Sequence, residues 1–247
     1  MTERRFVKHP RLRRALLTAL IVLILIAAAA VYAADYYRAD EAAGASITDP
    51  SPGIRVEAGK RRIAFIPDDP EAGLIFYPGG KVEYTAYAPL MEKLAEKGVL
   101  CVILKMPFNL AVLDANAAEG VADDYPEVDH WAVGGHSLGG AMAASYAAKH
   151  PGSADALVLL AAYSTSDLTG TGMKVISIYG TEDGIMNAGS YEKYRGNLPA
   201  DFSETVIDGG CHSYFGNYGL QKGDGEPFIS REEQQDLTAS TVVGLIS

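Results

Sequence analysis

Residues 131–144, Trp-Ala-Val-Gly-Gly-His-Ser-Leu-Gly-Gly-Ala-Met-Ala-Ala, decide the fold of this chain. The apolar residues Trp131 to Val133 predict a buried strand, and the small residues after Ser137 predict a helix. Residues 135–139 match the pattern Gly-x-Ser-x-Gly, which chance alone produces in on the order of one chain in ten of this length. Between a strand and a helix the pattern is much more specific. A sharp turn there strains the backbone of the serine and requires neighbours without a bulky Cβ. The stretch therefore predicts a nucleophile at Ser137.

A glycine-rich phosphate-binding turn is the alternative, but the lysine that a P-loop needs is missing nearby.

The rest of the chain from residue 53 alternates short apolar runs with helical patterns. We expect strands at residues 54–57, 62–66, 74–77, 99–104, 130–133, 156–161, 175–179 and 204–207. We expect helices at residues 84–97, 110–125, 138–150, 191–195 and 231–243. Apolar runs that are separated by helices predict an α/β fold with a mostly parallel sheet and helices on both faces. In such folds ligands bind at the carboxyl ends of the strands.

A serine hydroxyl is a poor nucleophile and needs a base, which the five histidines of the chain allow us to identify by elimination. His9 precedes the apolar N-terminal stretch, and His136 lies inside the turn with a side chain that should diverge from Ser137. His130 starts a strand at the opposite end of the sheet, and His150 ends a helix. His212 remains, and it follows the last predicted strand in a glycine-containing turn. It is the predicted base.

The residue that orients the base should follow the preceding strand. Residues 180–183 read Gly-Thr-Glu-Asp there, so Glu182 and Asp183 compete for this role, and the pattern Gly-x-x-Asp favours Asp183. Such a carboxylate holds the imidazole tautomer and stabilises the imidazolium that forms. The resulting order Ser137, Asp183, His212 is the one associated with a strand-to-helix serine in an α/β sheet.

The negative charge of a transition state needs hydrogen-bond donors. The backbone N–H of Leu138 follows the nucleophile at a helix N-terminus and supplies one. The second is expected from the turn after the first parallel strand, Tyr77-Pro78-Gly79-Gly80-Lys81, where we favour Gly80 over Lys81.

From about residue 72 to the C-terminus, the chain resembles the α/β-hydrolase superfamily, especially its compact lid-less bacterial members related to dienelactone hydrolases and small serine esterases. Four matching segments carry the resemblance: residues 77–80, 135–139, 180–183 and 210–212. The resemblance implies hydrolysis through an acyl-enzyme, without a cofactor or metal. Dienelactone hydrolases typically use cysteine where this chain has Ser137. Many relatives also carry a cap domain, for which residues 162–174 are too short.

Without a cap domain, the site is expected to be open and to be lined by short loops. We expect Lys81, Phe108 and Tyr214 on these loops to bind substrate, although the aromatic cluster at residues 214–218 fits equally well under the last helix. The predicted substrate is a carboxylic ester, either a small molecule or an acyl group of a lipid or envelope component. An acyltransferase that uses the same three residues is an open alternative. A non-catalytic binding module on the same scaffold is a further one.

The N-terminus predicts a membrane segment. Residues 1–14 form a basic segment with six Lys or Arg side chains, and residues 15–34 carry no charge. Twenty helical residues span roughly 30 Å, the thickness of a hydrocarbon core. The flanking basic residues favour a signal-anchor with the catalytic domain on the extracytoplasmic side. A cleaved signal peptide and a secreted domain are the alternative. Residues 35–52 are the predicted linker, and residues 53–247 the catalytic domain.

The charge of the chain excludes some partners. Residues 35–247 hold 15 basic and 30 acidic side chains. This excess of acid argues against nucleic acid as a partner and against binding to anionic lipid headgroups. The two cysteines, Cys101 and Cys211, fit no metal-ligand spacing and are expected to be small buried thiols, with a disulfide between them left open.

Overall fold

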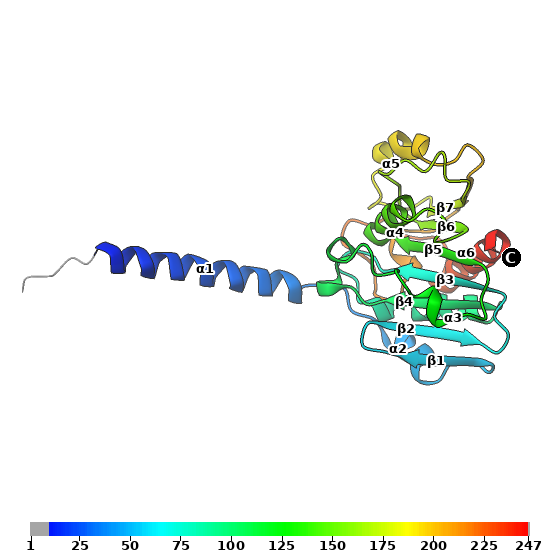
Figure 1. Ribbon diagram of the computed structural model, residues 1–247, viewed down its shortest axis with the longest axis horizontal. Helices are drawn as coiled ribbons and strands as arrows, with labels where there is room; N and C mark the ends of the chain where they lie inside the picture. The colour runs from blue at the N-terminus through cyan, green and yellow to red at the C-terminus, as the bar shows by residue number, and fades with distance from the viewer. Residues whose placement is uncertain (1–9, 247) are drawn as a thin grey trace, which may run out of the picture. The chain divides into compact units, whose positions relative to one another are not determined.

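A computed structural model of the chain describes residues 10–246 (Figure 1). The chain divides into two compact units, residues 1–35 and residues 36–247. The first unit contains helix α1 (Pro10–Ala34), whose residues 13–34 are long and apolar enough to cross a membrane and are not buried within the chain. A signal sequence has the same properties. The predicted basic segment 1–14 lies mostly outside the described residues.

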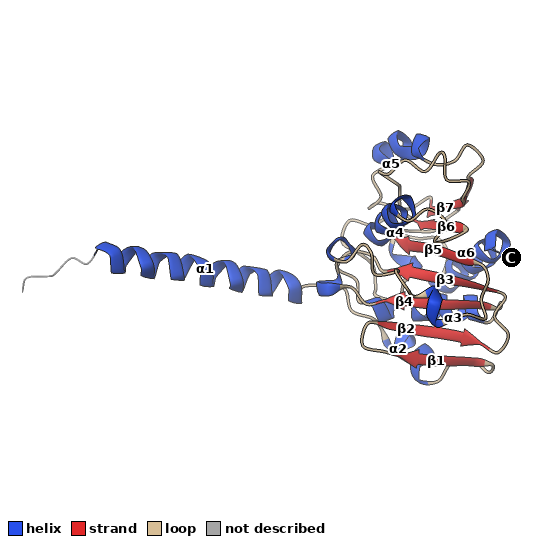
Figure 2. Ribbon diagram, in the orientation of Figure 1, coloured by secondary structure: helices blue, strands red, loops and turns tan. Residues whose placement is uncertain are grey.

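The second unit is built on an eight-stranded sheet with the order β1-β2-β4-β3-β5-β6-β7-β8 (Figure 2). The strands are β1 (Ile54–Ala58), β2 (Arg62–Pro67), β3 (Ala72–Tyr77), β4 (Val99–Leu104), β5 (Trp131–His136), β6 (Ala156–Leu160), β7 (Lys174–Gly180) and β8 (Ser203–Ile207). Strand β2 is antiparallel to both of its neighbours, and all pairs from β4 to β8 are parallel. The expected α/β fold with a mostly parallel sheet is confirmed, and each predicted strand lies within two residues of the observed one, except that β5 continues to His136.

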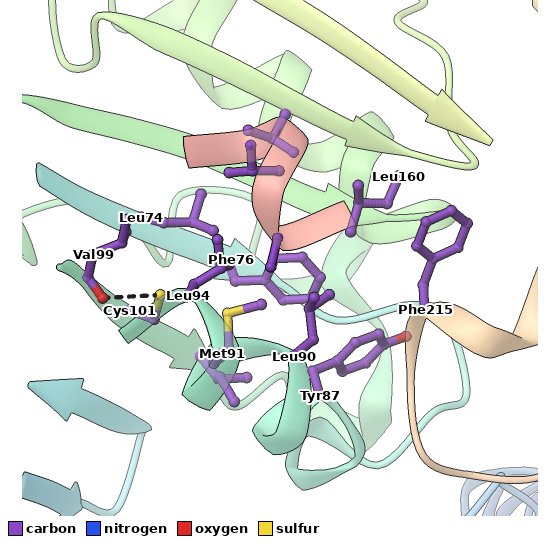
Figure 3. Packing of buried hydrophobic residues seen from close by; sticks show 14 of the residues in the cluster. Leu74, Phe76, Tyr87, Leu90, Met91, Leu94, Val99, Cys101, Leu160 and Phe215 are labelled. Carbon is purple, nitrogen blue, oxygen red and sulfur yellow. Dashed lines mark hydrogen bonds between the residues drawn. The ribbon is translucent and has the colours of Figure 1, made fainter. Parts of the chain in front are cut away.

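The helices cover the sheet on both faces. They are α2 (Glu41–Thr48), α3 (Ala88–Ala95), α4 (Leu138–Lys149), α5 (Ala188–Tyr194) and α6 (Arg231–Ile246). Helices α3 and α6 share one apolar core with one face of the sheet, and α4 packs in a second core on the other face. Figure 3 shows part of the first core, where Leu90, Met91 and Leu94 of α3 pack over Leu74 and Phe76 of β3. The buried Cys101 lies in the same core, and Cys211 is also buried; both thiols are free.

The prediction of a helix at residues 110–125 is wrong. Only two 3₁₀ turns form there, Ala111–Leu113 and Ala122–Asp124. The backbone between them makes isolated turn bonds, such as those from Ala117 to Asp114 and from Glu119 to Asn116, and no helical ladder. The Tyr77 hydroxyl also accepts the N–H of Ala118 and donates to the carbonyl of Ala115. The apolar spacing that predicts a helix here reflects burial of Ala118 and Val121 by a loop.

Residues 36–52 of the segment predicted as a linker, residues 35–52, belong to the second unit and include helix α2. Asp40 caps helix α2 by accepting the N–H of Ala43. Its other carboxylate oxygen accepts from Asn217 at 3.3 Å and from Arg231 at 3.1 Å. The sequence of this segment is rich in small and polar residues, but Asp40 caps its helix and reaches two distant side chains. Ala39 and Ser51 also donate their N–H groups to Glu83 and Glu92.

We predict that Asp40→Ala destabilises the second unit by about 1–2 kcal/mol, because the helix loses its N-cap and two further contacts. Urea unfolding of the full chain in detergent micelles measures this, since Trp131 is the single tryptophan and is buried. Asp49→Ala, which removes an exposed carboxylate at the other end of α2, is the matched control. Equal midpoints for the two variants would show that residues 36–52 contribute nothing to stability.

Candidate active site

Ser137 occupies the sharp turn between β5 and α4. Its backbone has φ 54° and ψ −122°, a conformation that costs energy for any residue except glycine. Its N–H donates to the carbonyl of Leu160 at 2.9 Å, which helps to hold the turn. A Cβ atom at Gly135 or at Gly139 would lie 2.5 or 2.2 Å from the carbonyl oxygen of Tyr77. The glycines of the pattern are therefore required because the turn packs directly against the end of β3.

His212 and Asp183 are hydrogen-bonded. Nδ1 of His212 lies 2.9 Å from Oδ2 of Asp183, and the two side chains are 1% and 3% exposed. The other oxygen of Asp183 accepts the N–H groups of Ile185 and Met186 at 2.9 and 2.7 Å. An ionised carboxylate only accepts hydrogen bonds, so Nδ1 carries the proton and Nε2 is left as the basic nitrogen. Of the two competing carboxylates, it is Asp183 and not Glu182 that reaches the histidine.

His212 lies beside the serine turn. The centre of its ring is 4.4 Å from that of His136, the residue before Ser137. Nε2 of His212 is buried, and no hydrogen bond reaches it from the residues that the structure describes. The structure thus joins Asp183 to His212 and places both next to the turn, but no hydrogen bond joins His212 to Ser137. In unliganded sites such contacts are often long and tighten only when substrate binds.

His136 connects the serine turn to the turn after β3. The hydroxyl of Tyr87 lies 2.8 Å from Nδ1 of His136 and accepts the N–H of Gly79 at 3.0 Å. Tyr87 and His136 are fully buried. Burial lowers the pKa of His136 well below its ordinary value, and the neighbouring His212 lowers it further. His136 is therefore neutral near pH 7 and adds no second positive charge beside His212.

The two residues predicted as N–H donors are neighbours in space. A Cβ atom at Gly80 would be 2.9 Å from Cδ2 of Leu138, so the two residues are in contact. Among the described residues, no hydrogen bond uses the N–H of Gly80 or that of Leu138. The N–H of Lys81 is already donated to the carbonyl of Asn109 at 2.8 Å, which favours Gly80 over Lys81 as the second donor.

Asp224 is a residue of this region that sequence reasoning missed. Its Oδ1 accepts the N–H groups of Gly184 and His212 at 3.1 and 3.2 Å. Its Oδ2 accepts both the N–H and the hydroxyl of Ser213 at 2.8 and 2.6 Å. One carboxylate thus ties the loop of Asp183 to the loop of His212. The only signal in the sequence is a carboxylate between two glycines at residues 223–225, which does not reveal that the loop folds back.

Hydrogen bonds keep Asp224 ionised. Partial burial acts to raise its pKa, but the hydrogen bonds from Ser213, Gly184 and His212 outweigh burial and lower the pKa below the ordinary value of 3.8. A lowered folded pKa means that this carboxylate contributes stability above its unfolded pKa, and that the contribution is lost as the pH falls through the folded value.

The predicted substrate-binding residues lie in different surroundings. Lys81 has φ 59° and follows Gly80 in the turn after β3. Phe108 is 67% exposed on the loop after β4. Tyr214 is partly buried, with the guanidinium of Arg231 at 5.0 Å from its ring centre, and Phe215 is fully buried at 5.6 Å from the ring of His136. The aromatic cluster after His212 therefore packs against α6 and the serine turn. The described residues include no group of three potential metal ligands.

Comparison with known proteins identifies the family of this chain. Residues 73–236 match the model of the alpha/beta hydrolase family, which covers more than half of the chain. The chain belongs to the alpha/beta hydrolase family. No curated protein sequence matches it.

Solved structures share its fold. TT1662 from Thermus thermophilus is 16% identical with a TM-score of 0.58, over 78% of this chain and 96% of that one. A predicted CIB-like hydrolase from Thermoplasma acidophilum is 13% identical with a TM-score of 0.58, over 78% and 100% of the two chains. A dienelactone hydrolase from Anabaena variabilis is 13% identical with a TM-score of 0.58, over 79% and 100%. At these identities the likeness concerns the fold alone.

We predict that Asp224→Asn lowers the hydrolase activity of the chain roughly 10- to 100-fold at pH 7, because the amide nitrogen cannot accept hydrogen bonds from the two loops. Asp208→Asn, which removes an exposed carboxylate from the turn before His212, is the control and should be close to wild type. The stability deficit of Asp224→Asn should shrink as the pH falls through the lowered folded pKa of Asp224. Wild-type activity in Asp224→Asn would contradict a role in positioning His212.

Proposed function

We propose that this alpha/beta hydrolase cleaves a carboxylic ester through an acyl-enzyme on Ser137. The observation that carries the proposal is the buried hydrogen bond between Asp183 and His212 beside the strained turn of Ser137. A buried pair of this kind next to a serine at a helix N-terminus supplies the three parts of an activated nucleophile. Membership of a hydrolase family agrees with it.

In the proposed reaction, Nε2 of His212 takes the hydroxyl proton of Ser137 as Oγ attacks the ester carbonyl. Asp183 stabilises the imidazolium that forms. The N–H groups of Leu138 and Gly80 hold the negative oxygen of the tetrahedral intermediate. The intermediate collapses to the acyl-enzyme, and His212 gives the proton to the leaving alcohol. Water then attacks the acyl-enzyme by the same steps, which releases the acid and restores Ser137.

We further propose that α1 stays in the membrane as an anchor and that residues 36–247 lie on the extracytoplasmic side. The support is the length and apolar character of residues 15–34 of α1 together with the basic residues that precede them. The same helix fits a cleaved signal peptide, and the mass of the mature protein distinguishes the two.

A fluorophosphonate probe tests the nucleophile. We expect one covalent adduct on Ser137, mapped by mass spectrometry, and its loss in Ser137→Ala and His212→Ala. Ser137→Ala should also lower ester hydrolysis by at least about a thousandfold without loss of folding. Ser240→Ala, at an exposed position of α6, is the control and should label like wild type. A folded protein that takes up no probe would overturn the proposal, and product analysis with added alcohols separates hydrolysis from acyl transfer.

Removal of residues 1–34 tests the independence of the catalytic unit. We expect a soluble protein with wild-type kcat/KM for a water-soluble ester, because both apolar cores lie within the second unit. Far-UV circular dichroism and the ester assay measure folding and activity. Insolubility or lost activity would show that the N-terminal segment belongs to the fold.

A further inference from the structure

The loop after β4 exposes an unusual set of apolar side chains. Phe108, Val112 and Leu113 are 67%, 55% and 56% exposed. Single exposed apolar residues are normal on soluble proteins, but here three lie within six residues of one loop. Phe108 and Asn109 also have φ values of 52° and 56°, which non-glycine residues rarely adopt. The backbone is thus strained where it presents the phenyl ring to solvent.

This loop is fixed to the candidate active site. The carbonyl of Asn109 accepts the N–H of Lys81, the residue after the proposed donor Gly80. The loop follows β4, and the turn of Gly80 follows β3, its direct neighbour in the sheet. The exposed apolar residues therefore lie on the same edge of the sheet as Ser137.

Several basic side chains lie next to this loop. A cavity of about 660 Å³ is lined by Lys60, Arg61, Arg62 and Lys105, together with two carboxylates, Asp114 and Glu119. These are four of the fifteen basic residues of an acidic unit. Arg61 is strongly exposed although it pairs with Asp114 at 3.3 Å. The net negative charge of residues 35–247 argues against binding to anionic headgroups. At this edge, however, the basic side chains locally outnumber the acidic ones.

The second unit begins at the same edge, at Tyr36 and Tyr37. Tyr37 donates its N–H to the carbonyl of Lys81 at 2.8 Å and accepts the N–H of Glu83 at 2.9 Å. Tyr37 follows Ala34, the last residue of α1, by three positions, a tether of about 10 Å when fully extended. A short tether that is fixed beside Gly80 favours contact between this edge and the membrane that holds the helix.

We propose that residues 107–113, with Lys60, Arg61 and Lys105 beside them, contact the surface of a lipid bilayer, and that the ester which reaches Ser137 is a lipid or lipid-linked ester of that bilayer. Aromatic and aliphatic side chains enter the boundary between headgroups and acyl chains, while lysine and arginine reach anionic headgroups. The statement about the substrate rests on the proposed ester hydrolysis. The statement about membrane contact rests on the proposed anchor α1 and not on the activity of Ser137.

Quenching by brominated lipids tests the membrane contact directly. The full-length Phe108→Trp variant is reconstituted into vesicles of phosphatidylcholine, alone or mixed with phosphatidylglycerol, with and without brominated acyl chains. Trp131 is buried and contributes a constant background. We expect strong quenching of the tryptophan at position 108, more of it with phosphatidylglycerol, and a decrease in Lys60→Ala and Lys105→Ala backgrounds or at high salt.

Leu237→Trp is the matched control for quenching. Leu237 is 47% exposed on α6 and lies beside Glu233 and Asp236, so anionic headgroups should be repelled there. Equal quenching at positions 108 and 237, or none at position 108 in protein that is inserted in the vesicles, would overturn membrane contact. A protein partner for the loop would then be the remaining explanation for its exposure.

Two substrates test the origin of the ester. We expect Leu113→Asp to lower turnover of an ester embedded in vesicles roughly tenfold and to leave a water-soluble ester unchanged, because only the first needs the bilayer contact. Leu237→Asp is the control for both. If wild type hydrolyses neither ester and Ser137 takes no probe, the proposed function fails while the quenching result still stands. A different outcome is possible when the wild type does hydrolyse the soluble ester. If Leu113→Asp then changes the turnover of both esters by the same factor, or of neither, the inference about the lipid ester is overturned.

Discussion

The close approach of the serine turn to the end of β3 is the contact on which the candidate site depends. The backbone at positions 135 and 139 packs against the carbonyl of Tyr77 so tightly that a single Cβ atom has no room. A clash of this kind involves backbone, so no side-chain rotation relieves it. The approach also brings the side chain of Leu138 against Gly80, the two residues whose N–H groups are the proposed donors. The strained φ of Ser137 is the cost of this geometry, and the bond to Leu160 and the start of α4 offset part of it.

Single polar side chains fix the loops around the candidate site, which have no regular secondary structure, by hydrogen bonds. The hydroxyl of Tyr87 joins Gly79 to His136, and the carboxylate of Asp224 joins Gly184 to His212 and Ser213. Each group is at least partly buried, where an unmade hydrogen bond costs more than a made one gains. The loops are therefore held in one arrangement by the penalty for leaving these groups unpaired. Site residues that loops carry need such support to keep a fixed geometry.

The sequence allows the sheet and the main candidate residues to be predicted, because both leave local patterns. Buried strands are short apolar runs, and Ser137, Asp183 and His212 each follow one. The helix expected at residues 110–125 does not form, and helix α2 within the expected linker is not predicted, for the opposite reason. Their structure is set by Tyr77 and Asp40, whose partners lie far along the chain. Asp224 and Tyr87 escape prediction in the same way, since periodicity records burial and not which distant backbone group a side chain will bond.

Local electrostatics govern this unit more than its total charge does. Residues 35–247 are strongly acidic, yet the surroundings of His212 are set by one buried carboxylate and by a second histidine that burial keeps neutral. A charged His136 at 4.4 Å would oppose the imidazolium that the proposed reaction requires, and in a buried site that repulsion is weakly screened. The turn of Ser137 thus tolerates a histidine beside the base only because its Nδ1 bonds to Tyr87 and its ring is fully buried. Exposure of that ring to water would remove the penalty on its charged form and bring a competing cation next to His212.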